Sequence, residues 1–136
     1  MKKQIKDLLI KLNSELNFKL IDGDIESYTC KIFKKAKFLT IFNNHKLEAF
    51  IAFYDNDINK EIAFLSMLAV DENSQGQGYG KILLEASFKL LRNKGFKKFD
   101  LEVDSRNLNA IKLYESFNFI VIFEGSKLRM RKDLFV

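Results

Sequence analysis

The chain is organised around one run of residues, Leu68-Ala69-Val70-Asp71-Glu72-Asn73-Ser74-Gln75-Gly76-Gln77-Gly78-Tyr79-Gly80-Lys81. It begins as the end of an apolar segment, Glu61–Val70, whose composition is typical of a buried strand. A glycine-rich loop follows and leads directly into a helical pattern. The first N–H groups of a helix lack intrahelical partners, and glycines let a backbone approach an anion closely. The run therefore predicts a site for a phosphate-bearing ligand.

The spacing of the glycines excludes two common nucleotide loops. Gly76, Gly78 and Gly80 alternate as G-x-G-x-G, whereas a dinucleotide fingerprint needs a longer second gap. The loop ends in Gly80-Lys81, but Ile82 follows where a P-loop has a hydroxyl for magnesium. The remaining pattern is Q-G-x-G-x-G behind a Leu-Ala-Val strand end.

Composition predicts one packed domain that spans residues 1–136. Apolar residues make up 47% of the chain, and 14 residues are Phe, so we expect a globular core. The one cysteine, Cys30, cannot form an internal disulfide, and we expect it to pack in a helix. Charged residues interrupt the apolar N-terminus, which therefore has the pattern of neither a signal peptide nor a membrane span. These features favour a cytoplasmic protein.

The charge of the chain permits a polyanionic ligand. The formal net charge is +5 and the pI is about 9.2. The lysines are scattered rather than gathered on one helix face, so we expect no nucleic-acid partner. No metal site is expected either, because His45 is the only histidine and Asp55-Asn56-Asp57 lacks the later residues of a calcium loop.

Hydrophobic periodicity and turn residues predict four helices and six strands. The first helix covers Lys2–Leu16, with a stripe of Ile5, Leu8, Leu9, Leu12 and Leu16. The second begins after Asp24 and buries Ile25, Tyr28, Thr29, Ile32 and Phe33. The other elements follow in chain order: strands at 38–42, 47–54 and 61–70, a helix from the glycine loop to Lys94, a strand at 99–103, a helix at 108–117, and strands at 119–123 and 127–133.

This order predicts an α/β (α+β) fold with a mixed, mostly antiparallel sheet of about six strands and helices on both faces. A strand–helix–strand crossover makes the segments 61–70 and 99–103 a parallel pair. We expect these two strands to splay apart at their carboxyl ends and to open a slot beside the glycine loop. An exposed C-terminal strand would allow two copies to pair, so a monomer or a homodimer is expected.

Two motifs resemble the GNAT superfamily of N-acetyltransferases. The acetyl-coenzyme A loop of that family reads Gln or Arg, two residues, Gly, one residue, then Gly or Ala, and Gln75, Gly78 and Gly80 match it. The segment Val103–Phe119 matches V-x-x-x-N-x-x-A-x-x-L-Y-x-x-x-G-F, with Asn118 in place of the glycine. The resemblance covers 68–119 and is closest to the small single-domain branch that includes bacterial ribosomal-protein N-terminal acetyltransferases.

The resemblance implies acetyl-coenzyme A as co-substrate. The strand end would pair with the pantetheine arm, and backbone N–H groups from Gln77 to Lys81 would hold the pyrophosphate. Asn107 would contact the coenzyme while it also caps the following helix. The implied binding residues are Leu68, Ala69, Val70, Gln75, Gly76, Gln77, Gly78, Tyr79, Gly80, Lys81 and Asn107.

The resemblance also implies direct transfer through a ternary complex, without a covalent intermediate or a metal. Tyr114 occupies the place of the residue that protonates the departing thiolate, and Glu102 that of the base. Glu61 and Asp104 remain alternative bases, and so does water.

The acceptor is a primary amine in this reading, and the sequence does not identify it. We expect the N-terminal helices, the turn 55–60 and the last hairpin to select it. Because that hairpin is short, a small amine such as an amino sugar, amino acid or polyamine is favoured over a protein N-terminus. A GNAT-fold module that binds coenzyme A without turnover is the alternative function.

Overall fold

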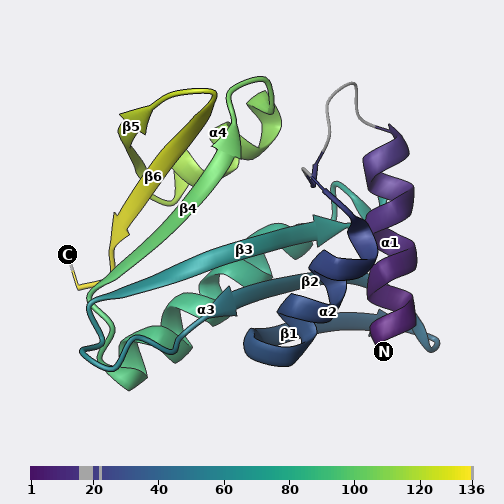
Figure 1. Cartoon of the computed structure of the whole chain (residues 1–136), viewed down its shortest axis with the longest axis horizontal. Helices are drawn as coiled ribbons and strands as arrows, with labels where there is room; N and C mark the ends of the chain where they lie inside the picture. The colour runs from purple at the N-terminus through teal and green to yellow at the C-terminus, as the bar shows by residue number, and fades with distance from the viewer. Residues whose placement is uncertain (16–19, 22, 136) are drawn as a thin grey trace.

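The computed structural model describes residues 1–15, 20–21 and 23–135. Its elements follow the predicted order (Figure 1). Leu16, which the sequence assigns to the first helix, lies outside the described residues. The elements are α1 (Lys2–Glu15), α2 (Ile25–Lys35), β1 (Lys37–Asn43), β2 (Lys46–Tyr54), β3 (Ile62–Val70), the 3-10 turn η1 (Glu72–Ser74), α3 (Tyr79–Lys94), β4 (Lys98–Asp104), α4 (Leu108–Ser116), β5 (Ile120–Glu124) and β6 (Lys127–Asp133).

The six strands form one mixed sheet in the order β1-β2-β3-β4-β6-β5. Only the β3–β4 pair is parallel, as the crossover through α3 predicts. Its register covers Ile62–Leu65 against Lys98–Leu101 and then stops, although β3 continues to Val70 and β4 to Asp104. Figure 1 shows the two strands diverging beyond that point. The predicted splay of the central pair is therefore confirmed.

A β-bulge at Ser66 changes the face on which the side chains of β3 lie. Ala52 of β2 pairs with Met67 and Phe53 with Leu65, so Ser66 is the extra residue. Before the bulge, Ala63 and Leu65 pack in the core beneath α3. After it, Met67 and Ala69 pack in the core beneath α1 and α2. The sequence shows only an apolar strand with one serine and does not predict this exchange.

Helices cover both faces of the sheet, as expected, but not equally. α1 and α2 lie over the β1–β3 half on one face, while α3 and α4 lie behind the sheet (Figure 1). The core on the α3 side is rich in aromatic rings, and Phe88 and Phe99 meet edge to face at 6.1 Å between ring centroids. The β4–β6–β5 half has no helix in front of it in the described part of the chain.

The helix ends follow local chemistry that is readable in the sequence. Asp24 caps α2 and accepts a hydrogen bond from the Ser27 N–H at 3.0 Å. Gly95 ends α3 with φ +90°, and Asn118 follows α4 with φ +70°, a left-handed conformation that Asn tolerates.

Three expectations are wrong. Cys30 lies in α2 but is exposed, because it falls on the outer side of that helix. Phe33 of the same helix is 36% exposed rather than buried. The C-terminal strand β6 is not an edge, since it pairs with both β4 and β5. The edge strand at this end of the sheet is β5, and all of its residues are exposed.

No helix in the described residues has the length and apolar character needed to cross a membrane. His45 lies exposed in the β1–β2 turn, as expected, with φ +67°.

Candidate functional site

The glycine loop connects β3 to α3 through backbone conformations that few other residues adopt. Gly76 has φ +87° and Gly78 has φ +79°, and nothing lies within 4 Å of a Cβ built on either one. Gly80 is needed for a different reason. A Cβ there would lie 3.3 Å from Leu113 Cδ2, so the bare backbone lets α3 approach α4 closely.

The N-terminus of α3 has the properties of an anion site. Gly78 is its cap residue and offers no side-chain hydrogen bond. The Ile82 N–H is bonded to the Gly78 carbonyl at 3.0 Å, so the N–H groups of the preceding residues 79–81 have no intrahelical partner. The helix dipole adds partial positive charge at the same place.

A buried carboxylate fixes the start of this loop. Asp71 is 3% exposed and accepts the Asn73 N–H at 3.2 Å. It also pairs with Lys11 of α1 at 2.8 Å and with Lys46 of β2 at 3.5 Å. These partners lower the pKa of the Asp71 carboxyl, with the Lys11 hydrogen bond as the largest cause. Asp71 thus ties the loop to α1 and to the sheet.

The end of β3 presents polar backbone groups to the splay. The Asp71 N–H is bonded to Glu48 of β2 at 2.8 Å. Since successive residues of a strand direct their backbone groups to opposite edges, those of Val70 and Leu68 face away from β2. The Val70 carbonyl accordingly accepts the Gln75 side-chain amide at 3.2 Å. The sequence predicts that the backbone of Ala69 pairs with the pantetheine arm, as those of Leu68 and Val70 do. In the structure the backbone groups of Ala69 face β2 and not the splay.

Two adjoining pockets follow the splay and the loop. Their volumes are about 390 and 500 Å³. Together they are lined by all the residues expected to bind coenzyme A except Gln77, which belongs to the same loop but lines neither pocket. The predicted residues that line them are Leu68, Ala69, Val70, Gln75, Gly76, Gly78, Tyr79, Gly80, Lys81 and Asn107. We call these two pockets the coenzyme slot.

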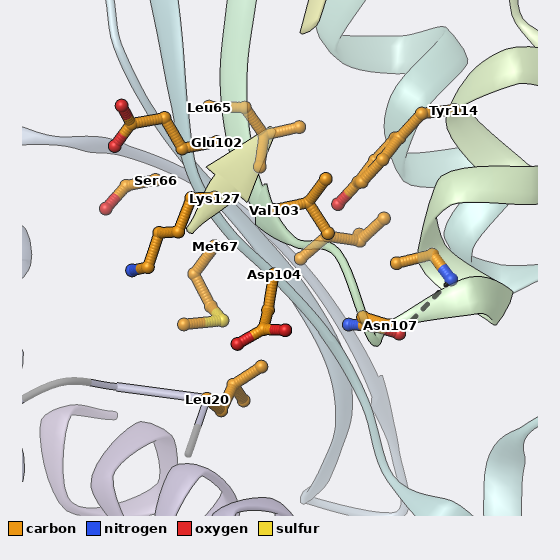
Figure 2. A pocket seen from close by; sticks show the side chains of 12 residues that line it. Leu20, Leu65, Ser66, Met67, Glu102, Val103, Asp104, Asn107, Tyr114 and Lys127 are labelled. Carbon is orange, nitrogen blue, oxygen red and sulfur yellow. Dashed lines mark hydrogen bonds between the residues drawn. The ribbon is translucent and has the colours of Figure 1, made fainter. Parts of the chain in front are cut away.

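A smaller pocket of about 90 Å³ lies between the diverging ends of β3 and β4. We call it the junction, because Tyr114 lines both it and the coenzyme slot, while Glu102 lines both it and a further pocket. Figure 2 shows the Tyr114 hydroxyl and the Glu102 carboxylate on opposite sides of it, with Val103 between them. The structure thus brings both residues expected to be catalytic to one cavity.

Tyr114 is held in the core with its hydroxyl toward the junction (Figure 2). The residue is 6% exposed, and its ring packs against Phe119 with centroids 5.6 Å apart. Burial raises the pKa of the phenol well above its ordinary value, so the hydroxyl stays protonated at neutral pH. Among the described residues the hydroxyl has no hydrogen-bond partner.

Asn107 caps α4, as predicted, and also lines the junction. Its side-chain oxygen accepts the Ala110 N–H at 3.3 Å. Figure 2 shows the amide nitrogen on the side away from that bond, next to the pocket. The structure therefore permits both roles expected for this residue.

The three carboxylates considered as bases are in different environments. Glu102 is exposed at the mouth of the junction, and no described residue forms an ion pair or hydrogen bond with it. Asp104 also lines the junction, but it binds Arg106 through both oxygens, at 2.9 and 2.7 Å. These bonds hold the pKa of Asp104 far below its usual value, which makes it a poor base. Glu61 directly precedes the first residue of β3, so it lies about 20 Å from the junction along the strand. It pairs with Lys97 at 3.1 Å.

A pocket of about 500 Å³ lies on the Glu102 side of the junction, between α2 and the sheet. We call it the acceptor pocket. Its wall contains Tyr28, whose hydroxyl lies 2.7 Å from Ser66 Oγ and donates to the Ser66 carbonyl at 3.1 Å. Burial raises the pKa of Tyr28 to about 12. Tyr54 and Phe64 add two further rings.

Sequence reasoning missed this pocket. Tyr28 appears in the sequence only as part of a helical stripe, and Tyr54 as the end of a strand. The one available signal is Ser66, the single hydroxyl residue within the apolar strand. Of the segments expected to select the acceptor, α2 and the last hairpin line the pocket, but α1 and the turn 55–60 do not. Nor does any cluster of metal-ligating side chains occur in the described residues.

Comparison with known proteins agrees with this geometry. The model of the Acetyltransferase (GNAT) family matches residues 8–119. The spermine/spermidine N(1)-acetyltransferase of Bacillus subtilis is 31% identical over 84 residues, which are 58% of this chain and 55% of that protein. The [ribosomal protein bS18]-alanine N-acetyltransferase of Escherichia coli is 40% identical over 68 residues, or 50% of this chain and 46% of that protein. The chain therefore matches only about half the length of these relatives.

A solved structure extends the similarity to the whole fold. The PaiA N-acetyltransferase of Thermoplasma acidophilum, solved in complex with coenzyme A, superposes with a TM-score of 0.76. The alignment covers 97% of this chain and 92% of that one, at 21% identity. The predicted mixed six-stranded fold is thus that of an acetyltransferase of known structure.

Proposed function

The chain belongs to the acetyltransferase (GNAT) family, and on this premise we propose that it transfers an acetyl group from acetyl-coenzyme A to a primary amine. Residues 1–136 would act as one acetyltransferase domain. The observation that supports this most strongly is the junction, which connects the coenzyme slot to a separate acceptor pocket. Two substrates entering from opposite sides would meet there, as direct transfer requires.

The coenzyme slot suits a polyanion with an amide-bearing arm. The uncapped N-terminus of α3 offers backbone N–H groups for a pyrophosphate, and Lys81 adds positive charge. The outward backbone groups of Leu68 and Val70 are placed to pair with amides, as an added strand would. Asn107 would contribute its amide nitrogen. These donors match coenzyme A in kind and in order along the slot.

Acetyl-coenzyme A supplies an acetyl thioester that is already activated toward amines. The protein has to align the amine and move protons. A free alkyl amine has a pKa of about 10, so a base must take its proton near neutral pH. Glu102 is the carboxylate that fits this role, because it is not engaged by the described residues and lies at the junction. A Leu68 backbone N–H would stabilise negative charge on the acyl oxygen.

Tyr114 would act as the general acid for the departing thiolate. Its raised pKa makes it a weak acid, but it guarantees a hydroxyl that can donate a hydrogen bond at the moment charge develops on sulfur. Because the surroundings of Tyr114 are apolar, that hydrogen bond is stronger than it would be in water. No covalent enzyme intermediate and no metal enter this mechanism.

For the acceptor we propose a small amine in preference to a protein N-terminus. The β5–β6 hairpin supports this choice, because only Gly125 and Ser126 join its strands and no long loop is available to hold a peptide. The relatives named above act on different amines, a polyamine and a ribosomal-protein alanine, so their names alone do not decide the question.

Thermal unfolding with and without acetyl-coenzyme A tests the coenzyme site. Selective binding to the folded state must raise the midpoint temperature. At a ligand concentration of one hundred times Kd, binding adds about 2.7 kcal/mol to the free energy of unfolding. We expect a rise with acetyl-coenzyme A and with coenzyme A, and a smaller one or none with ATP. Equal midpoints in all three ligands would contradict the proposed function.

Release of free thiol in the presence of an amine panel tests catalysis. In Glu102→Gln we expect turnover at neutral pH to fall by about a hundredfold. Turnover should recover as the pH approaches 10, where the amine loses its proton without help. If Glu102 only bound the acceptor, the substitution would raise the acceptor KM with no recovery at high pH.

A further inference from the structure

The β-bulge of β3 places two consecutive side chains on the acceptor side of the sheet. Leu65, just before the bulge, packs in the core beneath α3, whereas Ser66 and Met67 both line the junction and the acceptor pocket. In a regular strand, one of two consecutive side chains would lie on the opposite face. Met67 still packs in the core beneath α1 and α2. The bulge therefore brings the Ser66 hydroxyl to the acceptor pocket without removing a side chain from the core.

Two side-chain oxygens lie where the acceptor pocket opens into the junction. The described residues that line both cavities are Leu20, Leu65, Ser66, Met67, Glu102 and Lys127. Of these, Ser66 and Glu102 have side-chain oxygens, and the lysine ammonium can only donate. Figure 2 shows the Ser66 hydroxyl and the Glu102 carboxylate on the same side of the junction, opposite Tyr114. An amine that enters from the acceptor pocket therefore meets one anionic and one neutral hydrogen-bond acceptor.

Tyr28 fixes the direction of the Ser66 hydroxyl. The Tyr28 hydroxyl donates to the Ser66 carbonyl at 3.1 Å and lies 2.7 Å from Ser66 Oγ. A phenol has one hydrogen, and the carbonyl accepts it, so Ser66 is the donor in the second contact. The Tyr54 phenol also interacts with Ser66. Because a hydroxyl oxygen has two lone pairs and Tyr54 uses at most one, Ser66 can still accept a hydrogen bond from a ligand.

From this geometry we propose that Ser66 accepts a hydrogen bond from the acceptor amine and, together with Glu102, orients it for attack. A neutral primary amine has two N–H groups and one lone pair. With one N–H on Glu102 and the other on Ser66, the lone pair faces the coenzyme slot. As the bond between nitrogen and the acyl carbon forms, Glu102 takes the proton of the first N–H, while Ser66 holds the second.

Tyr28 is then a positioning residue, because it acts on the amine only through Ser66. Without the Tyr28 hydroxyl, the Ser66 hydroxyl could rotate and donate to the lone pair of the amine, which must stay free to attack. The inference rests on the proposed function, since it names further residues that hold the acceptor in that reaction.

The test compares the best primary amine of the panel with its N-methyl derivative, which has one N–H fewer. A site that hydrogen-bonds a substrate N–H discriminates against an analogue that lacks it. In Ser66→Ala we expect kcat/KM for the primary amine to fall about tenfold, because the N–H becomes more polar as the nitrogen gains charge. Turnover of the N-methyl amine should not fall. An equal loss for both amines would overturn the inference.

Two further variants separate the hydrogen bond from packing. Ser66→Thr keeps the hydroxyl and should retain most of the turnover of the primary amine, whereas a loss as large as in Ser66→Ala would overturn the inference. Thr40→Val is the matched control, because it also removes one hydroxyl from the sheet. Thr40 lies in β1 and lines neither the junction nor the acceptor pocket, so this variant should behave as the wild type.

A double-mutant cycle tests the role of Tyr28. Tyr28→Phe keeps the ring, and we expect it to lower kcat/KM for the primary amine severalfold. If Tyr28 acts through Ser66, the variant with both Tyr28→Phe and Ser66→Ala should be no slower than Ser66→Ala alone. Additive losses would contradict this role and indicate that Tyr28 only stabilises the fold.

The thermal shift with acetyl-coenzyme A distinguishes failure of this inference from failure of the proposed function. Ser66 does not line the coenzyme slot, so all of these variants should keep the wild-type shift. A wild-type protein with neither a shift nor thiol release would contradict the proposed function. A wild-type protein that acetylates the amine at the same kcat/KM as Ser66→Ala would overturn only the inference.

Discussion

The two sides of the junction are built in different ways. On the coenzyme side, the contacts that we propose come from backbone groups of a contiguous segment, the end of β3 and the glycine loop, with Asn107 and Tyr114 added from the cap and the body of α4. On the acceptor side, they come from side chains of α2, of the residues just before it, and of β2, β3, β4 and β6. A site made of backbone depends on local conformation. A site made of side chains depends on which elements the fold brings together, and it can change its ligand while the fold stays the same.

The supporting carboxylates differ in the same way. Asp71 fixes the coenzyme loop by binding one backbone N–H and two lysines. Among the described residues, the Asp100 carboxylate binds only the side chains of Arg129 and Arg131, and Arg129 in turn lies over Phe64 of the acceptor pocket. The difference leads to four predictions, each of which should affect one side more than the other.

The largest effect is expected for Tyr114→Phe. It removes one hydroxyl from the coenzyme side and leaves the buried ring in place. We expect kcat to fall by about a hundredfold or more, as for the loss of a general acid, with little change in either KM. Thiol release and the thermal shift with acetyl-coenzyme A measure the two quantities. An unchanged kcat would show that the Tyr114 hydroxyl takes no part in the reaction. Loss of the thermal shift with acetyl-coenzyme A would show that Tyr114 contributes to coenzyme binding instead.

Asp100→Asn should produce the largest loss of stability. Removing one partner of a buried ion pair leaves uncompensated charge, and with arginines that are one-third exposed we expect a cost of about 3 kcal/mol. Denaturant unfolding measures it. The triple variant in which Arg129 and Arg131 are also replaced by Met should recover part of the loss, since no unpaired charge then remains. Equal stability of Asp100→Asn and the wild type would show that the cluster is already solvated.

Asp71→Asn should have a smaller effect that depends on pH. The folded-state pKa of Asp71 is lowered, so its stabilisation is complete above the unfolded value of about 3.9 and is lost as the pH falls through the folded value. We expect a cost of about 1.5 kcal/mol at pH 7. The difference from the wild type should shrink below pH 4. Thermal unfolding between pH 2 and 7 gives both curves, and a constant difference across that range would contradict the ion-pair account.

The smallest effect is expected for Gly78→Ala. A non-glycine residue at φ +79° costs about 1 kcal/mol, and the strain should raise the KM for acetyl-coenzyme A severalfold without changing the KM for the amine. Gly78→Asn is the matched control, because Asn adopts the left-handed conformation more easily and should lose less. If both variants raised the amine KM instead, the two sides would not be separable.

Much of the fold could be predicted from the sequence because its signals are local. The apolar segment before the glycines, the caps at Asp24 and Asn107, and the left-handed ends at Gly95 and Asn118 all involve residues close together in the chain. The exposure of Cys30 and the interior position of β6 were not predictable in this way. Both depend on how an element is rotated or ordered within the sheet, and periodicity does not determine either.

The same distinction between local signals and long-range packing applies to the candidate site. The sequence by itself determined the parallel central pair, the anion-binding loop and the place of Tyr114, because backbone conformation and short motifs specify them. Only the tertiary structure placed Tyr28 against Ser66, exchanged the faces of β3 at a bulge, and gathered Lys31, Lys127 and Arg129 around one pocket. Those contacts join residues that are far apart in the chain, and long-range packing decides them.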